Sequence, residues 1–91
     1  MSAVRVAVVT GGASGIGRAS CLHLAADGHA VAVLDLDAGA AEAVAEEIRG
    51  HGVAAVGLAV DVSDRDAVFA AFDKVRGELG PVAILDTSAG R

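Results

Sequence analysis

The sequence predicts an α/β fold in which three helices pack on the two faces of one parallel sheet of four strands. Two observations lead to this prediction. Short, almost wholly apolar runs of Val and Ala alternate along the chain with longer segments whose apolar residues recur every three or four positions. Only a few residues connect these segments, which is typical of consecutive βαβ units. The length of 91 residues suits one small domain, so we expect residues 1–91 to form a single domain.

A glycine-rich turn joins the first predicted strand to the first predicted helix. Residues 4–10 are nearly all apolar, as in a strand that is buried on both faces. The helix is expected over residues 15–27, and Gly28 follows it at a position where left-handed backbone geometry is common. The second buried strand is expected over residues 30–34 and ends at Asp35.

The second helix is expected to begin after Asp37, whose carboxylate is suited to cap its first turn. Four apolar residues have the spacing of one helix face, while charged residues occupy the other: Ala41, Val44, Ala45 and Ile48. Gly50 and Gly52 end this helix. The third strand is expected over residues 53–60 and stops at Asp61.

The third helix is expected to begin at a capping pair formed by Ser63 and Asp66. Its apolar stripe consists of Val68, Ala71, Phe72, Val75 and Leu79. Gly80 and Pro81 end the helix, and a fourth strand is expected over residues 82–85.

The order of these elements determines the expected sheet topology. Right-handed crossovers place the first two helices on one face, and the third helix lies on the other face if the fourth strand returns beside the first. The predicted strand order is therefore 3-2-1-4. Ligands of such sheets bind beyond the carboxyl ends of the strands where the order reverses. Here that point lies between strands one and four, next to the glycine-rich turn.

Composition and charge argue against several classes of function. The net charge is −5 and the seven basic residues form no cluster, which argues against binding of nucleic acid or of an anionic membrane. No run approaches the roughly 18 apolar residues of a membrane span, so we expect a cytoplasmic protein. Cys21 is the single cysteine and fits a helix core, and the three histidines lack the spacing of metal ligands. No metal site is expected.

The glycine-rich turn has the spacing of a phosphate-binding loop. Gly11, Gly15 and Gly17 follow the pattern G-x-x-x-G-x-G between a strand and a helix, so the first N–H groups of the helix face the open side of the turn. The alternative is a purely structural role, in which glycine lets the helix pack closely on the strand. A triphosphate loop would need Lys and then Ser or Thr, where this chain has Arg18 and Ala19.

An acidic residue stands where the sugar of a dinucleotide would be recognised. Asp35 ends the second strand, eighteen residues after Gly17. A carboxylate at this distance accepts hydrogen bonds from a ribose hydroxyl and repels a 2′-phosphate, so the sequence favours NAD over NADP as the cofactor. Asp37 is the alternative candidate for this role, and Asp35 would then belong to a solvated turn or a helix cap.

Together these residues resemble the N-terminal half of a short-chain dehydrogenase/reductase, a family that includes 3-oxoacyl-carrier-protein reductases. The resemblance rests on TGGASGIG at residues 10–17, Asp35, Asp61-Val62 after strand three and Ala89-Gly90 after strand four. It implies a Rossmann fold that binds a nicotinamide dinucleotide, with the pyrophosphate along Gly11, Ser14, Gly15, Ile16 and Gly17. It also implies that Asp35 lies at the adenosine ribose, Asp61 and Val62 at the adenine, and Ala89 and Gly90 at the nicotinamide ribose.

Three features show how closely the chain follows the family. Members that prefer NADP often carry a basic residue before the second glycine, and Ser14 stands there, which agrees with Asp35. Thr87 and Ser88 replace the two asparagines that usually follow strand four. Asp86 replaces a buried aliphatic residue, and we expect it either to be exposed or to have a partner, because an isolated carboxylate in a covered strand is costly.

The residues for the family's chemistry are absent. The resemblance implies hydride transfer between the nicotinamide and a carbonyl or alcohol, with a tyrosine, a lysine and a serine that lie beyond strand four. This chain has no tyrosine, and its one lysine, Lys74, has the pattern of a solvated helix face, so no catalytic residue is expected. Two functions stay open: the cofactor-binding portion of an oxidoreductase, or a catalytically inert module that holds a nucleotide or a partner chain.

The predicted fold is incomplete relative to the family. Strand four is left as an exposed edge, and one face of the sheet carries a single helix. We therefore expect a truncated product that self-associates through this edge and this face.

Overall fold

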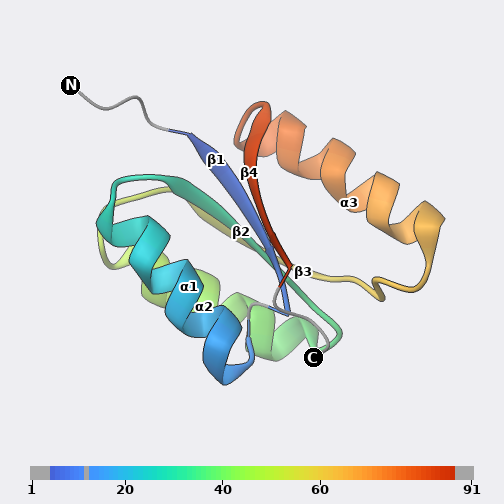
Figure 1. Cartoon of the computed structure of the whole chain (residues 1–91), viewed down its shortest axis with the longest axis horizontal. Coiled ribbons are helices and arrows are strands. Elements are labelled where there is room, and N and C mark those ends of the chain that lie inside the picture. The colour runs from blue at the N-terminus through green and yellow to red at the C-terminus, as the bar shows by residue number, and fades with distance from the viewer. Residues whose placement is uncertain (1–4, 12, 88–91) are drawn as a thin grey trace.

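The computed structural model describes residues 5–11 and 13–87, which form an alternating series of strands and helices (Figure 1). The elements are β1 (Val6–Thr10), α1 (Gly15–Ala26), β2 (Ala30–Asp35), α2 (Ala38–Arg49), β3 (Ala55–Ala59), α3 (Arg65–Glu78) and β4 (Val82–Thr87). The predicted order of elements is confirmed. β4 extends beyond its predicted end because it continues to pair with β1 as far as Thr87.

All four strands are parallel, and their order in the sheet is β3-β2-β1-β4, as predicted. Figure 1 shows α1 and α2 on one face of this sheet and α3 on the other. The carboxyl ends of the four strands meet at one end of the sheet, where β1 leads into the glycine-rich turn. The fold therefore brings the ends of strands that are distant in the sequence to one place.

The sheet separates two apolar layers. Val9 and Val33 pack in the layer with α1 and α2. Val8 and Leu34 point the other way and pack in the layer with α3. Successive side chains of β1 and β2 pack in opposite layers. Both strands are therefore buried along nearly their whole length, which explains their continuous apolar sequence.

The start of α3 differs from the prediction. The N-cap is Asp64, whose carboxylate Oδ1 accepts a hydrogen bond from the N–H of Ala67 at 3.2 Å. Ser63 does not cap the helix, because α3 begins at Arg65 and Ser63 stands one residue before the N-cap position; its hydroxyl donates to the carboxylate of Asp61 at 2.6 Å. Asp66 lies in the first turn of the helix. The predicted capping pair of Ser63 and Asp66 is therefore wrong.

Asp86 is half-buried near the end of β4. It pairs with Val9 of β1, which belongs to the layer under α1, and paired residues of neighbouring strands point to the same face. Asp86 therefore faces α1, where its negative charge acts on the thiol of Cys21. Asp86 interacts with neighbouring groups, so the second of the two expectations for this carboxylate holds.

Candidate functional site

The turn between β1 and α1 is held by Ser14. Gly11 has a φ of 67°, a left-handed conformation that suits glycine. Its carbonyl accepts hydrogen bonds from the N–H of Ser14 at 3.1 Å and from the hydroxyl of Ser14 at 2.7 Å. The same hydroxyl oxygen caps α1 by accepting from the N–H of Gly17 at 3.3 Å. Ser14 thus fixes the turn in the shape that presents the start of α1 to its open side.

Asp35 connects the end of β2 to this turn. Its Oδ2 accepts a hydrogen bond from the N–H of Ala13 at 3.1 Å, and its Oδ1 accepts from the N–H of Asp37 at 3.2 Å. Asp37 has a different role, because its carboxylate caps α2 by accepting from the N–H of Ala40 at 3.1 Å. Of the two candidate carboxylates, Asp35 is therefore the one that faces the glycine-rich turn.

A cavity of about 170 Å³ lies at the carboxyl ends of β1, β2 and β3. It is lined by Gly11, Asp35, Leu36, Val60, Asp61 and Val62. Four of these were predicted as site residues, and they come from three separate loops that the sheet topology brings together. Leu36 and Val60 were not predicted: the predicted positions came from the glycine-rich turn, the end of β2 and Asp61-Val62, and an apolar residue beside a strand end is not by itself a signal of a site.

Two exposed apolar side chains line this cavity: Leu36 is 74% exposed and Val62 is 48% exposed. Ile16 in the first turn of α1 is 77% exposed and is not one of the lining residues. A single exposed apolar residue is ordinary, but Leu36 and Val62 line one cavity together with the carboxylates of Asp35 and Asp61. A concave, mostly apolar lining with a few polar groups is typical of a small-molecule site.

Asp61 is exposed and negatively charged at the rim of the cavity. The hydroxyl and the N–H of Ser63 both donate to its Oδ1, at 2.6 and 2.9 Å. These two hydrogen bonds favour the charged form and lower the pKa of Asp61. Asp61 therefore stays an anion and a hydrogen-bond acceptor at neutral pH.

The remaining predicted positions are placed only in part. A Cβ added to Gly15 would meet no atom within 4 Å, so the start of α1 is open on this side. Thr87 lies at the end of β4, and with Thr10 and Leu85 it lines a second hollow of about 250 Å³ that shares Val62 with the first cavity. Ser88, Ala89 and Gly90 lie outside the described residues.

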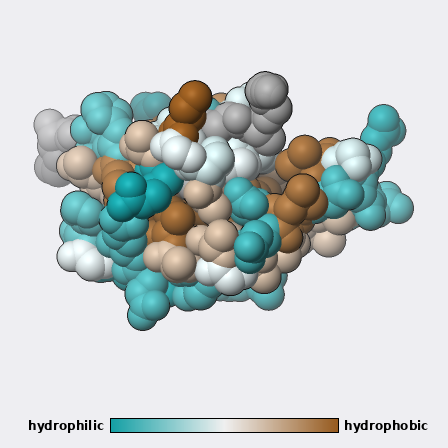
Figure 2. Space-filling model, turned by 90° about the horizontal axis from the view of Figure 1, so that it is seen from below, coloured by the Kyte–Doolittle hydropathy of each residue, from teal (hydrophilic) through white to brown (hydrophobic). Residues whose placement is uncertain are grey.

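A larger hollow lies elsewhere on the molecule. It has a volume of about 370 Å³ and runs along α3 between Val68, Phe69 and Arg76. Figure 2 shows hydrophobic residues in several groups, one of them toward the α3 end of the molecule. Because this hollow is lined by one helix and receives no loop from the ends of the strands, we place the candidate site at the smaller cavity.

The titratable groups of the described residues do not form a metal centre. Across residues 5–11 and 13–87, no three side chains of His, Cys, Asp or Glu come close enough to hold a metal ion. Lys74 is exposed on α3.

No helix of the described residues has the length and apolar character needed to cross a membrane.

Cys21 is expected to resist thiol reagents in the folded protein. Its side chain is fully buried in α1, and burial, with a further contribution from the charge of Asp86, raises its pKa from 9.0 to about 12. A rise of this size lowers the thiolate fraction at pH 8 by about a thousandfold. The reaction with an aromatic disulfide reagent, followed by absorbance, should be slow in buffer and fast in urea. Equal rates in both solutions would contradict the burial of this side chain.

The chain resembles known proteins over nearly its whole length. The family model described as short chain dehydrogenase matches residues 5–91. The D-threitol dehydrogenase of Mycolicibacterium smegmatis is 46% identical over 86 residues, which cover 94% of this chain and 33% of that protein. The 3-oxoacyl-[acyl-carrier-protein] reductase FabG of Pseudomonas aeruginosa is 37% identical and covers 94% of this chain and 35% of its own length. The chain thus spans about a third of the length of these relatives.

Solved structures agree with the sequence comparison. A crystal structure of NAD⁺-bound xylitol dehydrogenase superposes with a TM-score of 0.85 at 36% identity and covers 89% of this chain and 31% of that one. A short-chain type dehydrogenase/reductase from Mycobacterium marinum gives a TM-score of 0.83 at 37% identity, over 89% of this chain and 32% of that one. The predicted Rossmann-type fold and the predicted family resemblance are both confirmed. The chain belongs to the short-chain dehydrogenase family.

Proposed function

We propose that this chain is the dinucleotide-binding portion of an NAD-dependent oxidoreductase that acts on an alcohol or a carbonyl compound. The observation that carries the proposal is the position of the Asp35 carboxylate. It is hydrogen-bonded to the glycine-rich turn at Ala13 and lines one cavity with Gly11, Asp61 and Val62. An anion-binding turn, a sugar-binding carboxylate and an apolar slot for a base lie next to one another in that order.

The residues of this chain suit each part of a dinucleotide. The N–H groups at the start of α1, with the positive end of the helix dipole, attract the pyrophosphate, and Gly15 leaves room for it. The carboxylate of Asp35 accepts hydrogen bonds from ribose hydroxyls. Leu36 and Val62 provide apolar contacts for the adenine ring, with Asp61 as an acceptor at the rim.

Electrostatics at Asp35 support NAD over NADP as the cofactor. A 2′-phosphate on the ribose would place a second anion within a few ångströms of this half-buried carboxylate. Two like charges about 4 Å apart repel by about 1 kcal/mol in water and by about 4 kcal/mol at an effective dielectric constant of about 20. Arg18 in the first turn of α1 is ion-paired with Glu47, and no arginine or lysine stands at residues 36 and 37 to compensate for this repulsion.

The chain's own residues bind and orient; they do not carry out the proton transfer of a dehydrogenase. The nicotinamide, when bound, supplies or accepts the hydride. Proton transfer to or from the substrate oxygen needs a side chain with a suitable pKa, and the 91 residues contain no tyrosine and only the exposed Lys74. Binding without turnover is therefore the expected property of this chain.

The finer assignment to a 3-oxoacyl-carrier-protein reductase is part of the same proposal. A relative named as a reductase of this kind and a relative named as D-threitol dehydrogenase each match 86 residues of this chain. The cavity described here would hold the cofactor and not the substrate, so it favours neither of them. A catalytically inert nucleotide-binding module is the alternative function.

Titration calorimetry with NADH, NADPH and ATP tests the proposal. We expect NADH to bind at least about tenfold more tightly than NADPH, because Asp35 accepts from the ribose of the first and repels the phosphate of the second. ATP should bind more weakly than NADH, because the chain lacks the lysine of a triphosphate loop. Tighter binding of NADPH would contradict the role of Asp35, and binding of none of the three would contradict the proposed function.

Mixing the chain with NADH and a generic ketone, and following the absorbance of NADH, tests whether this chain carries out the reaction by itself. Turnover by this chain alone would contradict the absence of a proton donor. Binding of NADH without turnover is the expected result.

A further inference from the structure

The outer edge of β3 is one of the two edges of the sheet. β3 pairs with β2 on one side and with no other strand of the described chain. On that paired side the carbonyl of Ala54 accepts from the N–H of Val31 at 3.0 Å, and the N–H of Val60 donates to the carbonyl of Asp35 at 2.8 Å. Since backbone groups alternate in direction along a strand, the carbonyl of Ala55 and the N–H of Gly57 point to the outer edge.

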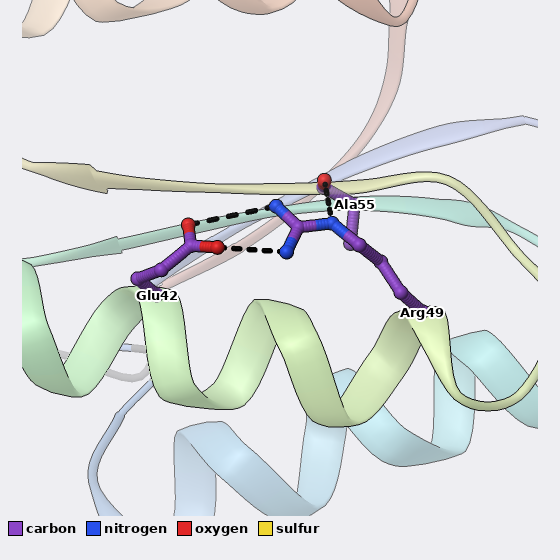
Figure 3. Close-up of polar contacts among 3 residues, drawn as sticks. All are labelled: Glu42, Arg49 and Ala55. Atoms are coloured by element: carbon purple, nitrogen blue, oxygen red, sulfur yellow. Dashed lines mark hydrogen bonds and ion pairs between the residues drawn. The ribbon is translucent and has the colours of Figure 1, made fainter.

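Two side chains of α2 reach these outward-pointing backbone groups. The Nε of Arg49 donates to the carbonyl of Ala55 at 3.0 Å, and its Nη1 donates to Oε2 of Glu42 at 2.7 Å (Figure 3). The backbone N–H of Gly57 also acts on the carboxylate of Glu42 and contributes to lowering its pKa. The bond from Arg49, with a smaller contribution from Gly57, lowers the pKa of Glu42, so the carboxylate stays charged at neutral pH.

The two backbone groups are the pair that a neighbouring strand would use. In a parallel ladder, one residue of the added strand donates its N–H to the carbonyl before its opposite residue and accepts at its own carbonyl from the N–H after it. Opposite Val56, those two groups are the carbonyl of Ala55 and the N–H of Gly57. The guanidinium of Arg49 stands in for the donor, and the carboxylate of Glu42 stands in for the acceptor.

Gly57 allows α2 to approach closely enough for this arrangement. A Cβ at this position would lie 2.7 Å from the carbonyl carbon and oxygen of Ala41 and 2.7 Å from the backbone nitrogen of Glu42. The backbone of α2 at Ala41 and Glu42 therefore passes directly over Gly57 of β3. The small residue and the ion pair form one local arrangement.

We propose that the ion pair of Glu42 and Arg49 closes the outer edge of β3 against the addition of another strand. An exposed parallel edge is a template for pairing with a second chain, and charged side chains over the edge are a common means of blocking it. Both side chains are about half exposed, and an ion pair so exposed adds little to folding stability. Its contribution to folding stability therefore does not explain why the ion pair is present. Its position over the carbonyl of Ala55 and the N–H of Gly57 does. The inference does not depend on dinucleotide binding.

A matched pair of double variants of the full chain tests the proposal. Glu42→Ala/Arg49→Ala removes the ion pair at the edge. Arg18→Ala/Glu47→Ala removes an ion pair of similar exposure between α1 and α2, in which Arg18 Nε and Glu47 Oε1 are 2.9 Å apart and no backbone group of β3 takes part. Both double variants keep the net charge of the chain; the first removes both members of its pair from α2, and the second removes Glu47 from α2 and Arg18 from α1.

The readout is self-association, measured by sedimentation velocity over a range of protein concentrations, with the infrared amide band of intermolecular sheet as a second signal. Two newly available backbone hydrogen bonds correspond to about a twentyfold higher association constant in the edge variant, and the control variant should match the wild type. Circular dichroism in urea checks that both variants are folded. Equal association of the two double variants would overturn the proposal.

A charge-swapped variant keeps the experiment decisive if the alanine variant does not fold. Glu42→Arg/Arg49→Glu preserves an ion pair and the net charge, but it places a carboxylate opposite the carbonyl of Ala55, where no hydrogen bond can form. We expect this variant to associate like the alanine variant. If the charge-swapped variant self-associates no more than the wild type, the two residues act only as an ion pair, and the proposed closure of the edge is wrong.

Discussion

Replacing Gly57 with alanine is expected to lower the free energy of unfolding by about 2 to 3 kcal/mol, at the upper end of the usual cost of overpacking. The new Cβ would lie 2.7 Å from backbone atoms of Ala41 and Glu42. A backbone cannot rotate out of the way as a side chain can, so α2 has to move off β3. Ala41 and Ala45 are fully buried in the layer between them, and that layer would loosen. Urea unfolding followed by circular dichroism measures the loss.

Gly77→Ala is the control for this prediction, with the opposite sign. Gly77 lies in α3, is exposed, and has no atom within 4 Å of an added Cβ. Alanine in the interior of an exposed helix is more favourable than glycine by up to about 1 kcal/mol, so this variant should be slightly more stable than the wild type. A Gly57→Ala variant as stable as Gly77→Ala would show that α2 does not pass so close to β3.

The two glycines also show what the sequence could predict and what it could not. The strand order and the placement of the helices were predicted from the spacing of apolar residues along each segment and from the right-handedness of crossovers. Neither of these depends on a single residue. Gly57 was not singled out, because a glycine inside a strand can mark a bulge, a bend or the close approach of another backbone, and the sequence does not distinguish among these. Only the packing of α2 on β3 gives it a purpose.

The capping error at α3 has a similar cause. Three polar residues lie near the start of this helix: Ser63, Asp64 and Asp66. Either Ser63 or Asp64 would suit the N-cap position by residue type. In the structure the helix begins at Arg65, so Asp64 stands at the N-cap position, while Ser63 forms a turn with Asp61. The residue types alone do not show at which residue the helix begins, so they do not show which side chain caps it.

The candidate site was predictable to the extent that strand ends mark it. Gly11, Asp35, Asp61 and Val62 each follow or end a strand, and parallel strands bring such positions together. Leu36 carried a weaker signal, an apolar residue between two aspartates just after a buried strand. Its exposure becomes informative only beside the cavity, because an isolated exposed leucine is ordinary.

Asp35→Asn is expected to remove most of the preference for NADH over NADPH. The amide keeps the size of the side chain and one oxygen that can accept from the N–H of Ala13, so the glycine-rich turn should keep its shape. Loss of the charge weakens the hydrogen bonds from the ribose, and NADH affinity should fall by about tenfold. The same loss removes the repulsion of a 2′-phosphate, so NADPH affinity should rise by a similar factor.

Asp37→Asn provides a matched control for this change, two residues along the chain. Asp37 caps α2 through Ala40, and asparagine is about as good an N-cap as aspartate, so folding should be preserved. Its carboxylate does not line the cavity. Calorimetric titration of both variants with NADH and NADPH separates the two carboxylates. A shift in preference with Asp37→Asn and none with Asp35→Asn would transfer the role to the other aspartate. Loss of affinity for both dinucleotides in Asp35→Asn would instead mean that the carboxylate acts by holding the turn at Ala13.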